Sequence, residues 1–60
     1  MSHVYNPESD IIAEIERLEL EARTIRRRVE HATNQDDKRV LNRQLQELKE
    51  QIEYLKGRLP

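Results

Sequence analysis

Two runs of apolar residues, spaced by alternating steps of four and three, constrain this chain more than any other feature of its sequence. The first run is Ile11, Ile15, Leu18, Ala22, Ile25, Val29 and Ala32, and the second is Leu41, Leu45, Leu48, Ile52, Leu55 and Leu59. This spacing is the a and d pattern of a coiled coil, which places one apolar stripe along each helix. We call these thirteen residues the seam. They predict an all-α fold.

The two runs are separated by a step of nine residues between Ala32 and Leu41. A continuous coiled coil absorbs insertions of three or four residues, and this step matches neither those nor a heptad. Inside it lie Asn34, Asp36 and Asp37, residue types that cap helices and tolerate turns. The sequence therefore predicts one domain folded as an antiparallel helical hairpin. Its expected parts are an extension at 1–6, a first helix at 7–33, a turn at 34–36 and a second helix at 37–59.

Charged residues beside the seam favour the antiparallel arrangement. Antiparallel helices bring their e positions opposite one another and their g positions opposite one another. The pairs that then meet are Glu14 with Arg58, Glu19 with Lys56, and Arg26 with Lys49. Two pairs are attractive and the third is repulsive. Exposed pairs contribute only ~0–1 kcal/mol each, so they select orientation more than they stabilise. The alternative, one long helix in a parallel dimer, has to absorb the nine-residue break.

The size of the chain indicates that the hairpin does not act alone. Sixty residues with no cysteine are close to the length at which a lone hydrophobic core becomes inadequate without disulfides, metal or oligomerisation. Two-fold symmetry is the commonest arrangement among homo-oligomers. We therefore expect a homo-oligomer, with a homodimeric four-helix bundle as the favoured assembly.

Apolar residues outside the seam form a candidate partner surface. They are Val4, Tyr5, Ile12, Leu20, Val40 and Tyr54. Ile12 widens the apolar stripe of the first helix towards the broader face that a four-helix bundle requires. Val4 and Tyr5 precede the first helix. They either fold onto the end of the bundle or belong to a free peptide that another protein binds. Single exposed apolar residues are also ordinary on protein surfaces.

A cluster of arginines is the densest candidate for contact with an anion or a nucleic acid. It comprises Arg23, Arg26, Arg27 and Arg28. Arginine-rich helices bind phosphates and enter nucleic-acid grooves. However, Glu30 is spaced to pair with Arg26 or Arg27, and no aromatic side chain lies nearby to stack a base. The favoured interpretation is a solvated face, so nucleic acid is not the expected partner.

The sequence indicates no catalytic, cofactor or metal chemistry. The only histidines, His3 and His31, lack a second ligand at helical spacing. The glutamates fall outside the seam, whereas a catalytic acid needs a desolvated pocket. There is no glycine-rich phosphate loop or cofactor fingerprint. The chain also shows no signal peptide and no apolar segment of membrane-spanning length, so we expect a soluble, cytoplasmic protein without a membrane partner.

The function that fits this sequence is that of a small, non-enzymatic coiled-coil interaction protein, structural or regulatory. Such a protein acts through self-association and through binding of a protein partner. Two alternatives stay open at this stage. One is a small nucleic-acid-binding protein that uses the arginine cluster. The other is an inhibitor-like peptide that forms a hetero-bundle with an enzyme or a secretion component.

Overall fold

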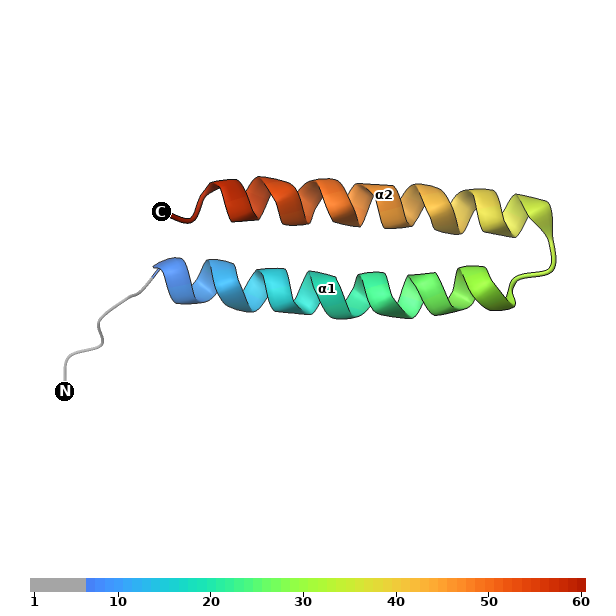
Figure 1. Ribbon diagram of the computed structural model, residues 1–60, viewed down its shortest axis with the longest axis horizontal. Coiled ribbons are helices and arrows are strands. Elements are labelled where there is room, and N and C mark those ends of the chain that lie inside the picture. Colours follow the sequence, from blue (N-terminus) through green and yellow to red (C-terminus); the bar gives the residue numbers. More distant parts are fainter. Residues whose placement is uncertain (1–6) are drawn as a thin grey trace.

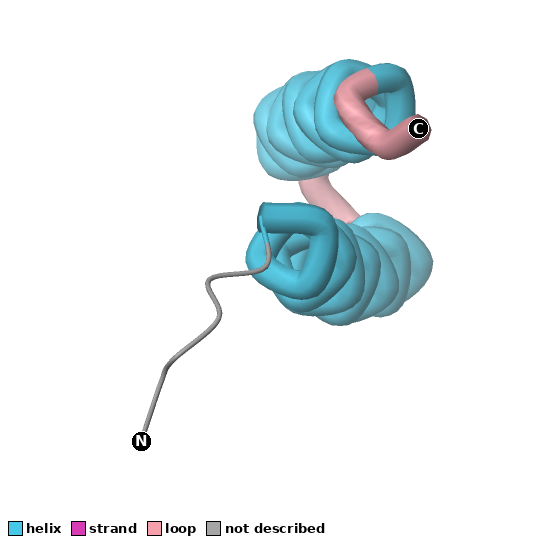
Figure 2. The backbone as a smooth tube through the Cα atoms, turned by 90° about the vertical axis from the view of Figure 1, so that its left-hand side faces the viewer, coloured by secondary structure: helices cyan, strands magenta, loops and turns pink. Residues whose placement is uncertain are grey.

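The computed structural model describes residues 7–60, which form two antiparallel helices joined by a short turn (Figure 1). Helix α1 spans Pro7–His31 and helix α2 spans Gln35–Gly57. Seen from the end at which the chain finishes, the two helices lie side by side and the turn joins them at the far end (Figure 2). The all-α hairpin expected from the seam is confirmed. Neither helix is long and apolar enough to cross a membrane.

The interiors of both helices are free of proline and glycine. The two prolines and the single glycine of the chain stand at Pro7, Gly57 and Pro60, at or beyond the helix ends. Pro7 occupies the first position of α1, where a missing N–H costs nothing. Acidic side chains in the first turn of each helix and basic side chains in the last turn complement the helix dipoles.

The turn lies at residues 32–34, two residues earlier than the sequence indicated. Asn34 has extended backbone angles of φ −93° and ψ 129°, and its Oδ1 accepts a hydrogen bond from the Asp36 N–H at 2.7 Å. Its carbonyl accepts the Lys38 N–H at 3.1 Å. Asn34, the last residue of the turn, is therefore the N-cap of α2, so α2 begins at Gln35 instead of at 37. Helix α1 ends at His31 instead of at 33.

Helix α2 also ends two residues before the expected position of 59. The Arg58 N–H donates to the Leu55 carbonyl at 3.0 Å and the Leu59 N–H donates to the Lys56 carbonyl at 3.2 Å. These are bonds of three-residue span, which tighten the last turn. Pro60 disfavours the helical conformation at Leu59 because its ring clashes with the preceding residue.

Seam residues from both helices form the core. The buried residues are Ile15, Leu18 and Ala22 from α1 and Leu48 and Ile52 from α2. The other eight seam residues are half-buried. Outside the seam, the half-buried residues of the described chain are Glu14 and Lys38. Lys38 stands three residues before Leu41 and so continues the a and d pattern into the first turn of α2.

The cap at Asn34 generates a prediction about stability. Asn34→Ala removes the acceptor of the Asp36 N–H and should lower the free energy of unfolding by about 1 kcal/mol. Urea denaturation followed by circular dichroism measures this change. Asn34→Asp is the matched control, because an aspartate supplies the same acceptor. Equal losses in the two variants would show that the cap does not stabilise α2.

The buried position of Leu48 generates a second prediction. Leu48→Asp places a carboxylate in the narrow core, where an unpaired charge is far more costly than in water. Most of the helical signal in circular dichroism should be lost. Val40→Asp introduces the same group at a site on the same helix that is 56% exposed, and it should keep its helicity. Retention of full helicity in Leu48→Asp would contradict the core described above.

Candidate interaction surfaces

Two grooves run along the seam, one on each side of the plane that contains the two helices. The a residues Ala22 and Ile52 form the floor of one groove, and the d residues Ile25 and Leu48 form the floor of the other. This division follows from helix geometry, because a residues lean towards the e side of the stripe and d residues lean towards the g side. The two grooves differ in charge and in size.

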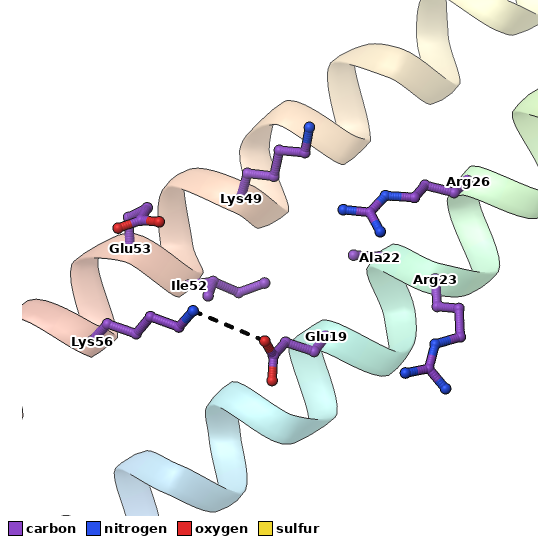
Figure 3. Close-up of a pocket in the computed structure, with 8 residues that line it drawn as sticks. All are labelled: Glu19, Ala22, Arg23, Arg26, Lys49, Ile52, Glu53 and Lys56. Atoms are coloured by element: carbon purple, nitrogen blue, oxygen red, sulfur yellow. Dashed lines mark ion pairs between the residues drawn. The ribbon is translucent and has the colours of Figure 1, made fainter.

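The larger groove has a volume of about 570 Å³ and a basic lining. Its residues are Glu19, Ala22, Arg23, Arg26, Lys49, Ile52, Glu53 and Lys56 (Figure 3). We call it the basic groove, because four cations and two carboxylates surround its apolar floor. Ala22 is buried opposite Ile52, and its short side chain leaves the space that a leucine at this a position would fill.

One ion pair crosses the basic groove. Lys56 Nζ lies 4.0 Å from Glu19 Oε2, and both side chains are about half exposed at 51%. This is one of the contacts expected from the antiparallel alignment of the e positions. An exposed pair at this distance contributes little to stability. It therefore reports the direction and register of the two helices more than it holds them together.

Like charges face each other one heptad further along the same groove. Arg26 extends into the space between the helices towards the stretch of α2 that carries Lys49 (Figure 3). Within residues 7–60 neither cation forms an ion pair. Arg23 likewise forms no ion pair within the described chain. In Figure 3 its guanidinium points away from α2. The basic groove therefore presents cationic groups whose charge this chain does not neutralise.

The arginine cluster of the sequence is divided between different faces of α1. Arg23 and Arg26 line the basic groove. Arg28 lines a shallow hollow of about 410 Å³ on another side of α1, together with Leu20, Thr24 and Ile25. Arg27, at an f position, lines none of these hollows. The cluster is contiguous in sequence, whereas the cations that the fold brings together are Arg23, Arg26, Lys49 and Lys56.

The signal for Lys49 and Lys56 was present in the sequence, because both stand at e positions of the second run. Their neighbourhood with Arg23 and Arg26 depends on the antiparallel pairing of the helices, which a search for local charge runs does not detect. The two cross-helix pairs expected from the e positions, Glu19 with Lys56 and Arg26 with Lys49, were the signals of this groove in the sequence.

The opposite groove is smaller, at about 240 Å³, and its cross-helix positions are less charged. It is lined by Glu21, Ile25, Gln44, Glu47, Leu48 and Gln51. Gln44 and Gln51 at the g positions of α2 present uncharged amides. On the α1 side of this groove Glu21 is already paired with a neighbour on its own helix. Arg17 donates to Glu21 at 2.7 Å and to Glu14. These contacts raise the pKa of the Arg17 guanidinium above its ordinary value, through the hydrogen bond to Glu14 first and then the charges of Glu14 and Glu21.

The expected pair between Glu14 and Arg58 is wrong. Glu14 pairs with Arg17 three residues further along α1, a contact that one helix supplies by itself. The Arg58 guanidinium lies 6.0 Å from the centre of the Tyr54 ring on α2, within range of a cation–π interaction. The Glu14 carboxylate and the Arg58 guanidinium thus each have a partner within four residues along the chain.

The candidate partner surface is exposed wherever the structure describes it. The exposed fractions are 45% for Ile12, 59% for Leu20, 56% for Val40 and 67% for Tyr54. Val4 and Tyr5 lie outside the described residues. Ile12 stands at an e position on the side of the basic groove, whereas the f and c positions of the other three residues turn them away from it.

Comparison with known proteins adds no identification. No family model matches the chain, and neither a curated protein nor a solved structure matches it. Among residues 7–60 no group of three or more histidine, aspartate or glutamate side chains is arranged to hold a metal ion. The features of this protein that bear on function are therefore the surfaces described above.

The two cross-helix contacts of the basic groove generate a prediction. Double-mutant cycles isolate the energy of a pair from the other effects of each substitution. A cycle of Glu19→Gln and Lys56→Gln should give an attractive coupling, and a cycle of Arg26→Gln and Lys49→Gln should give a repulsive one, each about 0.2–1 kcal/mol at low salt. Thermal unfolding at one fixed protein concentration measures both.

The salt dependence of these couplings provides the check. Both should shrink in 1 M salt, where the screening length is only ~3 Å. Two couplings of the same sign would contradict the register described for α1 and α2.

Proposed function

We propose that this protein is a non-enzymatic interaction module whose hairpin pairs with a second copy of itself in a four-helix bundle and presents its remaining apolar residues to a protein partner in the cytosol. The role is structural or regulatory. The bundle buries the seam residues that one hairpin leaves partly exposed. The contact with the partner carries out the structural or regulatory role. No covalent chemistry is part of the proposal.

Incomplete burial of the seam carries this proposal. Ile11, Ile25, Leu45, Leu55 and Leu59 pack against the core while staying partly exposed, and no side chain of residues 7–60 is fully buried. Two helices in contact cover only one side of each stripe, so both grooves leave seam atoms open to water. Each square ångström of apolar surface removed from water contributes ~25 cal/mol. A second hairpin on one groove covers more of these residues and stabilises the fold.

Exposed apolar residues away from the basic groove support the second part of the proposal. Leu20, Val40 and Tyr54 are all more than half exposed. Leu20 also borders the shallow hollow on α1, whose walls include the methyl-bearing Thr24. Apolar side chains beside a hollow are a common feature of protein interfaces, where a partner residue fills the space. A tyrosine supplies both a large contact area and a polar hydroxyl group.

Nucleic acid is a weaker candidate. The arginine cluster is divided between different faces of α1, so its members do not act on one phosphate backbone together. The formal net charge of −1 supplies no general attraction. Tyr54, an aromatic side chain of the described region, has its ring under Arg58, away from the basic groove.

Sedimentation equilibrium tests the self-association. At micromolar concentration the chain should sediment with twice the mass of the sequence, and its melting temperature should rise with protein concentration because dimer formation stabilises the folded state by mass action. A well-folded monomer with a concentration-independent melting temperature would contradict the proposal.

A further inference from the structure

We infer that the basic groove is the surface by which two copies of this chain join, with the α1 helices of the two copies crossing antiparallel beside Ala22. This inference rests on the proposed self-association and states which face carries it. The occupant of the groove is the same edge of α1 from the second copy. The bound edge presents carboxylates to the cations that the hairpin leaves unpaired.

The order of charges along α1 is the first argument. Between residues 16 and 26 the e and b positions on the groove side carry Glu16, Glu19, Arg23 and Arg26 in that order, and Glu30 follows at the next b position. Two acids are thus followed by two bases at spacings of three and four residues, and all four side chains are exposed. When two copies of this stretch lie antiparallel, the acids of each copy lie opposite the bases of the other. In an antiparallel crossing centred near Ala22, Glu16 meets Arg26 of the second copy and Glu19 meets its Arg23.

The pairing state of these groups is the second argument. Glu16, Arg23 and Arg26 form no ion pair within residues 7–60, and Glu19 has only its 4.0 Å contact with Lys56. By contrast, Glu14, Arg17 and Glu21 on the other edge of α1 already satisfy one another. The groove edge therefore holds the charges that are available for contact between copies, since forming new pairs there breaks none of the hydrogen-bonded ones.

The shape of the groove is the third argument. Ala22 forms its floor and lies at the centre of the proposed crossing. Small residues at a helix crossing let two helices approach closely, because no long side chain keeps the axes apart. The same crossing places Ile12, which is 45% exposed, beside the half-buried Val29 of the second copy. The contact thus covers one off-seam apolar residue and one end of the open seam.

The groove face of the hairpin is about as large as the surface that one partner of a standard interface buries. A helix of 25 residues is ~38 Å long, and two helices side by side are ~20 Å wide. A face of this size is comparable with the ~800 Å² that each partner buries in a standard interface. Leu20, Val40 and Tyr54 stay outside this contact, where the proposed protein partner reaches them.

A charge-exchange experiment tests the inference. Arg23→Glu with Arg26→Glu makes all four of these positions acidic, and Glu16→Arg with Glu19→Arg makes all four basic. Each variant alone should dimerise at least about tenfold more weakly than the unmodified chain, because like charges meet across the crossing. An equimolar mixture of the two should form a heterodimer of at least the original affinity. Sedimentation equilibrium at low salt measures all three samples, and circular dichroism records their helicity.

Matched controls separate the edge from general charge effects. Arg27→Glu with Arg43→Glu changes the charge by the same amount at f positions, which face away from the seam, and should leave the dimer affinity unchanged. Arg23→Gln with Arg26→Gln removes the cations without adding acids. It should weaken the dimer by a smaller factor and serves if the glutamate variant loses helicity.

The outcomes distinguish this inference from the proposed function on which it rests. If the unmodified chain dimerises and both charge variants dimerise equally well, the copies join through another face, and only the inference fails. A monomeric unmodified chain overturns both. Binding of a short oligonucleotide that competes with dimerisation, without recovery in the mixed sample, would assign the cations of the groove to nucleic acid instead and overturn the inference.

Discussion

Contact between Ile15, Leu18 and Ala22 on α1 and Leu48 and Ile52 on α2 is the interaction on which the rest of this structure depends. It sets the register of the hairpin, and the register decides which charged side chains meet across it. The core is narrow because two helices enclose only the stripe between them. A protein with this architecture has little interior in which to build a desolvated site, and its properties are those of its faces.

Both faces follow from this one contact, yet they differ in character. On one side the register brings Arg26 opposite Lys49 above the short side chain of Ala22, which produces a broad groove with uncompensated positive charge. On the other side uncharged glutamines approach the seam, and Arg17 neutralises its neighbours. This division fits the proposed assembly, in which the basic groove joins two copies by charge order and shape and apolar residues elsewhere are left for a different partner.

Contacts between residues close in sequence explain the differences between the predicted and the observed structure. The turn was misplaced by two residues because Asn34 fits two roles, the end of one helix or the cap of the next, and the bond from the Asp36 N–H selects the second. Glu14 was assigned to Arg58 across the hairpin, whereas Arg17, three residues further along the same helix, is its neighbour on the helix surface and pairs with it. The pair between Glu19 and Lys56 was predicted correctly because neither residue takes an ion-pair partner on its own helix.

The sequence by itself determined that this chain folds as a helical hairpin. The a and d spacing, its nine-residue break and the position of Asn34 are local features, and each acts through the geometry of a single helix or turn. Only the tertiary structure decided that Arg23 lines the same groove as Arg26, Lys49 and Lys56 while Arg27 and Arg28 do not. Residues distant along the chain come together according to the register of two packed helices, and that register is a property of the whole core rather than of any segment.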